Sequence, residues 1–137
     1  MRRSRQLLII QPRVQHYRLA FFDRLCELVQ DRYELLVIGS TDNGRAFGGG
    51  SRSYIKHIPL REILGMLYWP SILRVVLSQR PECIVVTASP RILSAWLLAV
   101  VGRFCGIRVL GWSKVYADPD QSRGILRKLV VVCFYKL

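Results

Sequence analysis

The stretch LLIIQPRVQHYRLAFFDRL, residues 7–25, places an apolar run, a polar loop and an amphipathic segment in immediate succession. The apolar run predicts a strand over residues 6–10, because short continuous apolar segments are typical of strands covered on both faces. Apolar residues then recur at three- and four-residue spacing, which predicts a helix over residues 18–30. A strand that leads directly into a helix is the first part of a βαβ unit with parallel strands.

The same alternation continues along the rest of the chain. Apolar runs predict further strands over residues 34–39, 82–86 and 107–112, and a weaker alternating pattern predicts one over residues 54–58. Helices are predicted over residues 68–79, over 90–105 and from 125 onward.

Three residues bound the helix predicted over 90–105. Ser89 is a favoured N-cap type, Pro90 suits a first turn, and Gly106 can end the helix in the left-handed conformation. Pro70 would likewise occupy the first turn of the preceding helix.

Strands that alternate with helices predict a single α/β domain over residues 1–137. We expect a Rossmann-like, mostly parallel sheet with helices on both faces. The first strand should be central, and Ile9, Val37, Val85 and Val109 should lie in the sheet.

The charge of the chain is strongly positive. Lysine and arginine number 21 against 9 aspartate and glutamate residues, which gives a formal net charge of +12. Such a charge favours an anionic partner, namely nucleic acid, a phosphate-bearing ligand or an anionic lipid surface. An arginine-rich composition with a solvated surface is the alternative explanation. Nucleic acid is disfavoured, because the chain has no aromatic–basic RNA-binding motif and no helix-turn-helix pattern.

The cysteines and histidines argue against a metal site or a disulfide framework. The four cysteines form no C-x-x-C pair and lie in apolar surroundings, so we expect buried reduced thiols; with only two histidines, no metal site is predicted.

The first apolar run is too short for a signal peptide, and ILSAWLLAVVG, residues 92–102, is too short to cross a bilayer. We therefore expect a cytoplasmic protein, either free or peripheral at the inner face of the membrane.

The loop after the first predicted strand contains no glycine. The dinucleotide fingerprint G-x-G-x-x-G is absent there, so NAD binding is disfavoured and no cofactor is expected. The glycines at positions 48–50 follow the second predicted strand instead.

Four segments, in this order, resemble the N-terminal domain of glycosyltransferase family 4. They are IIQPRVQHYRLAFFDRL at 9–25, YELLVIG at 33–39, RPECIVV at 80–86 and SPRILSAWLLAVVGRFCGIRVLGW at 89–112. The resemblance covers almost the whole chain and implies a GT-B enzyme, in which two Rossmann-like domains face a cleft. The N-terminal domain of such an enzyme holds the acceptor, and the C-terminal domain holds the nucleotide-sugar.

The resemblance implies that this chain is the acceptor-binding half of an enzyme that transfers a sugar from a nucleotide-sugar to a glycan or lipid-linked acceptor. A separate or missing donor domain would supply the E-x7-E carboxylates. The family's domain normally continues beyond the last strand seen here, so we expect an incomplete domain that is inactive alone. Catalytic residues stay unassigned. The alternatives are a non-catalytic module that binds glycan or phosphate and, less favoured, a nucleic-acid-binding α/β protein.

Ligands of open parallel sheets bind outside the carboxyl ends of the strands. Side-chain donors in the loops at those ends suit hydroxyls and phosphates, and we expect them to converge around one concavity. Where the family often has a histidine after the last strand, this chain has serine and lysine. The candidate acceptor-binding residues are Arg13, Gln15, His16, Arg18, Ser89, Arg91, Ser113 and Lys114. Two of these residues also have a structural interpretation in place of acceptor binding. His16 would pack at the start of the helix, and Arg18 would neutralise acidic neighbours.

The last part of the sequence combines basic and apolar residues. Arg123, Arg127 and Lys128 precede the run LVVVCFYKL at 129–137. A helix of this kind lies on an anionic membrane or is covered by the remainder of the fold, and the second alternative is favoured.

Overall fold

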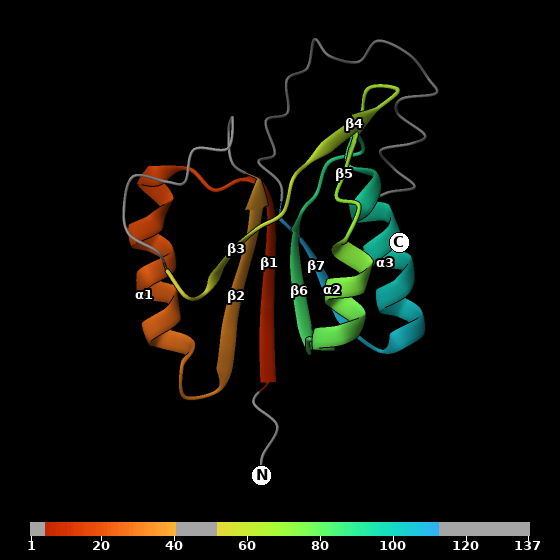
Figure 1. Cartoon of the computed structure of the whole chain (residues 1–137). Helices are drawn as coiled ribbons and strands as arrows, with labels where there is room; N and C mark the ends of the chain where they lie inside the picture. The colour runs from red at the N-terminus through yellow and green to blue at the C-terminus, as the bar shows by residue number, and fades with distance from the viewer. Residues whose placement is uncertain (1–4, 41–51, 113–137) are drawn as a thin grey trace, which may run out of the picture.

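The computed structural model describes residues 5–40 and 52–112, which form an α/β unit (Figure 1). Ser113, Lys114, most of the glycine-rich segment and the helix expected from residue 125 lie outside the described residues. The elements are β1 (Arg5–Arg13), a 3-10 helix η1 (His16–Arg18), α1 (Leu19–Val29), β2 (Tyr33–Ser40), β3 (Ile55–His57), β4 (Arg61–Ile63), β5 (Met66–Tyr68), α2 (Ile72–Gln79), β6 (Cys83–Thr87), α3 (Leu93–Cys105) and β7 (Arg108–Trp112).

Five of the described strands form one parallel sheet in the order β3-β2-β1-β6-β7, so the first strand is central as predicted. Ile9 of β1 lies beside Val37 of β2 and Val85 of β6. In the next ladder Ile84 of β6 lies beside Val109 of β7. The prediction of a Rossmann-like parallel sheet, with these residues in it, is confirmed.

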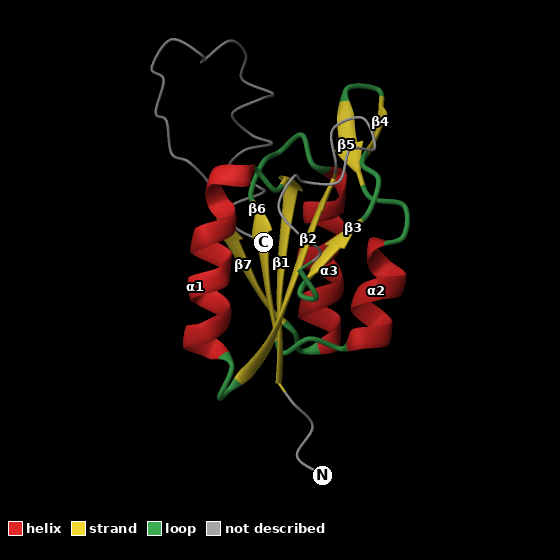
Figure 2. Cartoon of the chain, turned by 60° about the vertical axis from the view of Figure 1, so that its left-hand side comes forward, coloured by secondary structure: helices red, strands yellow, loops and turns green. Residues whose placement is uncertain are grey.

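Helices cover both faces of the sheet, also as predicted (Figure 2). Successive residues of a strand point to opposite faces, so Ile9 packs under α1 against Phe22, whereas Leu8 and Ile10 face α2 and α3. Phe22, Leu8 and Ile10 are all fully buried. Each such side chain stabilises the fold by about 1.5–3 kcal/mol relative to exposure. The apolar run of the first strand is thus explained by its two covered faces.

Residues 61–68 form a hairpin that the sequence pattern did not predict. Strands β4 and β5 pair antiparallel, and the helix expected over 68–79 begins only at Ile72. The turn residues Leu64 and Gly65 have φ values of 51° and 76°. Positive φ at both positions is the geometry of a tight two-residue hairpin turn. Leucine is an unusual residue for the first of these positions, so the usual turn signal was missing.

The start of α3 was also predicted wrongly. Ser89 was expected to cap the helix, but α3 begins at Leu93 with Ile92 at the cap position. Ser89 closes a separate turn, in which its carbonyl accepts a hydrogen bond from the Ile92 amide at 3.0 Å. The predicted end is confirmed, because Gly106 takes the left-handed conformation with φ of 67°.

The described cysteines are less buried than predicted. Cys26 and Cys83 are half-buried and Cys105 is exposed, while Cys133 lies outside the described residues. Cys105 is the last residue of α3, where the helix leaves the sheet and its side chain meets solvent. Within residues 5–40 and 52–112, no helix is both long and apolar enough to span a bilayer.

Candidate functional site

The carboxyl ends of β1, β6 and β7 lie at the same edge of the sheet, because these strands are parallel and adjacent. At this edge the chain enters η1 after β1, turns toward α3 after β6, and reaches Trp112 at the end of β7. In Figure 1 the β4–β5 hairpin stands beyond the same edge, next to the start of α3. The edge therefore gathers the loops in which the candidate residues were predicted.

Arg18 links the central strand β1 to the outer strand β7 at this edge. Its Nη1 donates a hydrogen bond of 3.1 Å to Oε1 of Gln11, a side chain that is only 2% exposed at the end of the apolar run of β1. Its guanidinium carbon lies 5.6 Å from the ring centroid of Trp112 on β7 and 5.7 Å from that of Tyr17. These distances are within the range of cation–π attraction. Arg18 is thus held in one orientation by a buried amide and by aromatic rings.

Aromatic rings extend this cluster across the surface. Phe21 of α1 packs edge-on against Trp112, with 6.2 Å between ring centroids. Tyr17, Phe21 and Trp112 are 60%, 50% and 39% exposed. Rigid, exposed rings present a large apolar area whose ordering on binding costs little entropy. We call Gln11, Tyr17, Arg18, Phe21 and Trp112 the Arg18 cluster.

Of the residues in this cluster, only Arg18 was predicted from the sequence. Gln11 was missed, although a polar residue directly after four apolar ones in a buried strand is a signal for a buried, hydrogen-bonded amide. The pairing of Arg18 with Trp112 joins residues that are distant in the chain, and no local pattern contains it.

The loop after β1 is held by packing rather than by glycine. Val14 is fully buried, and a Cβ atom at Gly39 of β2 would lie only 2.5 Å from its Cγ2 atom. The close approach of Val14 therefore requires a glycine at position 39 of the neighbouring strand β2, and not within the loop itself. Gln15 contributes its carbonyl, which accepts a hydrogen bond from the Arg18 amide at 2.9 Å. The side chains of Arg13, Gln15 and His16 are exposed around this anchored turn.

The second group of candidates lies at the hairpin. The Arg91 amide donates to Oγ of Ser89 at 3.4 Å, and Nη2 of Arg91 donates to the Gly65 carbonyl at 3.5 Å. The Arg91 carbonyl accepts a hydrogen bond of 2.8 Å from the Leu67 amide. The structure thus brings Ser89 and Arg91 together with the β4–β5 hairpin, and Arg18 together with β1 and β7.

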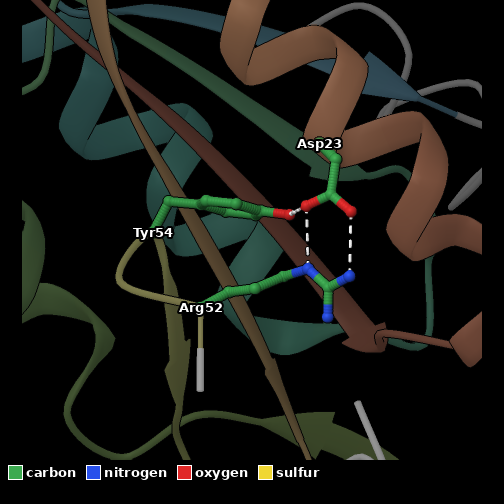
Figure 3. Close-up of polar contacts among 3 residues, drawn as sticks. All are labelled: Asp23, Arg52 and Tyr54. Atoms are coloured by element: carbon green, nitrogen blue, oxygen red, sulfur yellow. Dashed lines mark hydrogen bonds and ion pairs between the residues drawn. The ribbon is translucent and has the colours of Figure 1, made fainter. Parts of the chain in front are cut away.

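A polar cluster on the α1 face of the sheet ties the start of β3 to the helix (Figure 3). Arg52 donates from Nε and Nη2 to the two carboxylate oxygens of Asp23 at 2.7 and 2.8 Å, and the Tyr54 hydroxyl donates to Oδ1 of Asp23. The hydrogen bond from Arg52, followed by that from Tyr54, lowers the pKa of Asp23 from 3.8 to about 2. Burial, together with the Asp23 carboxylate, raises the pKa of Tyr54. An ionised and fully paired carboxylate is a structural link, not a general base.

Two open pockets lie away from the Arg18 cluster. One lies between the end of α1 and the start of β2, where Cys26, Tyr33 and Tyr54 line it. The other lies between α3 and β7 and is lined by small and apolar residues such as Ala99 and Val109. Among the described residues, no group of three or more histidine, cysteine or acidic side chains could hold a metal ion.

No family model, curated protein or solved structure matches this chain. The parallel sheet and the side chains at its carboxyl edge are therefore the observations from which a function can be inferred.

Proposed function

We propose that this chain is the acceptor-binding half of a glycosyltransferase. It would hold a glycan or lipid-linked acceptor while a separate domain holds the nucleotide-sugar, and the sugar would pass from one to the other. The resemblance of four ordered segments to family 4 N-terminal domains supports the proposal. A Rossmann-like parallel sheet, which such a domain requires, supports it further.

The Arg18 cluster is the observation that carries the proposal. A guanidinium has five N–H donors, and the bond to Gln11 uses one of them. The others can donate to hydroxyl or phosphate oxygens of an acceptor. The exposed parts of the Trp112 and Tyr17 rings offer apolar surface for the C–H face of a sugar ring. A fixed cation beside exposed rings fits a ligand that is both oxygen-rich and partly apolar.

The role of this half is orientation. Transfer requires the acceptor hydroxyl to be held close to the reacting carbon of the sugar, and correct positioning alone lowers the barrier by as much as roughly 7–11 kcal/mol. The charge that develops on the departing diphosphate needs preorganised hydrogen-bond donors. In the proposed arrangement the donor domain supplies them, and the carboxyl edge of this sheet faces that domain.

Immobilised oligosaccharides and a lipid extract that contains lipid-linked glycans provide the test. We expect the purified chain to retain a subset of these glycans, and Arg18→Ala and Trp112→Ala each to weaken retention by about tenfold, which corresponds to one lost charge-assisted contact. Arg24→Ala is the matched control, since Arg24 lies on α1 and pairs with Glu27 at 2.7 Å. Glycan retention that is absent, or equal in all variants, would refute the proposed site.

A further inference from the structure

Helix α3 is apolar on both of its faces. Ala95, Leu98 and Gly102 are buried toward the sheet. The opposite face carries Leu93, Leu97, Val100 and Phe104, which are 46%, 40%, 41% and 87% exposed. Their spacing of four, three and four residues places them in one row along the helix. A surface helix normally presents polar residues to water, and exposed apolar patches mark interaction sites. We therefore expect this row to contact an apolar partner.

The β4–β5 hairpin, next to the start of α3, adds two more exposed apolar residues. Ile63 and Leu64 at its tip are 52% and 99% exposed. The hairpin is fixed to the helix entry, because Leu67 bridges to Ile92 and the Arg91 guanidinium contacts the Gly65 carbonyl. The hairpin is thus held at the start of the helix that carries the row. We call Ile63, Leu64, Leu93, Leu97, Val100 and Phe104 the α3–hairpin patch.

Leu64 is the member of this patch that the fold does not explain. It belongs to neither of the apolar cores that the described residues form, and its φ of 51° is a conformation that leucine disfavours and that asparagine or glycine would adopt more easily. Neither burial nor turn geometry accounts for leucine at this position. An apolar contact outside the chain would account for it.

The charges around the patch indicate which partner it meets. Exposed Arg61, Arg91 and Arg103 border it, against one exposed carboxylate, Glu62, and α3 itself has no acidic residue. A second copy packed antiparallel along α3 would bring Arg91 of one chain near Arg103 of the other, which is unfavourable. An anionic lipid surface would attract these cations and accept the apolar row.

We propose that the α3–hairpin patch docks on an anionic lipid bilayer, with α3 along the surface and the Leu64 tip in the interface. The hairpin end of the patch lies beside the carboxyl edge, so docking would hold that edge near lipid-linked acceptors; this last consequence rests on the proposed function. The docking itself does not involve the Arg18 cluster, and each proposal can fail without the other.

Co-sedimentation with phosphatidylcholine vesicles, with and without phosphatidylglycerol, tests the docking in the absence of any glycan. The variants are Leu64→Asn, which suits the positive φ, and the double variant Leu97→Gln/Phe104→Gln. Leu28→Gln is the matched control, since Leu28 is 66% exposed on α1 at the opposite face of the sheet. We expect the wild-type chain to bind anionic vesicles at least about tenfold more tightly than neutral ones. Both patch variants should lose about tenfold, and the control should not change.

Thermal melting separates lost docking from lost folding, and Leu64→Asn should melt no lower than wild type. Equal vesicle binding by all variants, or no preference for anionic lipid, would overturn the proposal. A chain that is dimeric in solution and becomes monomeric in the double variant would also overturn it, because a second copy would then cover the patch.

Discussion

Val14 and Gly39 approach each other so closely that residue 39 has no room for a side chain. A Cβ atom there would lie 2.5 Å from Cγ2 of Val14 and 3.2 Å from its backbone nitrogen. Through this contact β2 fixes the loop that leads from β1 to η1. The orientation of Arg18, and with it the candidate site, therefore depends on a packing contact between neighbouring strands.

Gly39→Ala should destabilise the fold by about 1–3 kcal/mol, because an added methyl group in a well-packed core forces its neighbours to move. Urea unfolding followed by circular dichroism measures the loss. In the double variant Val14→Ala/Gly39→Ala the effect of the added methyl should largely disappear. Equal costs of Gly39→Ala in both backgrounds would show that the contact is not responsible.

The polar cluster of Asp23, Arg52 and Tyr54 predicts a specific dependence of stability on pH. The folded-state pKa of Asp23 is about 2, below the ordinary 3.8, so its ionised form stabilises the fold above pH 3.8. This contribution is lost as the pH falls from 3.8 toward 2. Asp23→Asn should therefore lower the urea midpoint at neutral pH and flatten its decline in acid. A variant whose acid decline matches that of wild type would contradict this assignment.

Native thiol labelling should distinguish the described cysteines. Cys105 is exposed, whereas Cys83 is half-buried and burial raises its pKa. Because the thiolate is the reacting form, Cys105 should react faster than Cys83. Cys105→Ser should remove one fast-reacting equivalent in a time course with an aromatic disulfide reagent, and Cys83→Ser should remove a slower one. The reverse order of reactivity would contradict the placement of these two side chains.

The isolated chain should not sustain sugar transfer. The acceptor edge orients a hydroxyl, but the leaving diphosphate requires stabilising groups that we assign to another domain. Incubation with labelled UDP-glucose or GDP-mannose and lipid extract should therefore give no product above background. Sustained transfer by the chain alone, abolished by Arg18→Ala or by Lys114→Ala, would assign both halves of the chemistry to this chain.

Local sequence patterns predicted the sheet best at its inner strands β1, β2 and β6, because burial on both faces leaves continuous apolar runs such as that of β1. The same patterns failed to predict β4 and β5, because these strands have only three residues each, are partly exposed and show no alternation of buried and exposed side chains. Ser89 and Pro90 have the residue types typical of a helix N-terminus, which led to a wrong prediction of the start of α3. The serine instead closes a turn that precedes the helix.

The candidate site was predictable only in part. Parallel strands place their following loops at one edge, so the location of Arg18 followed from the strand–loop–helix order. Its partners Gln11 and Trp112 come from the middle of one strand and the end of another. Contacts of this kind depend on sheet order and register, which the spacing of residues in a single segment does not contain.

Nuclear magnetic resonance of the ¹⁵N-labelled chain tests the central claim most directly, because the Trp112 indole N–H reports on the Arg18 cluster. Once assigned by Trp112→Phe, this signal should shift on titration with an oligosaccharide that the chain retains, and it should stay in place with UDP-glucose or GDP-mannose alone. The Arg18→Ala variant should lose the response to the oligosaccharide. A Trp112 signal that moves with the nucleotide-sugars and ignores the retained glycan would contradict the assignment of this edge to the acceptor.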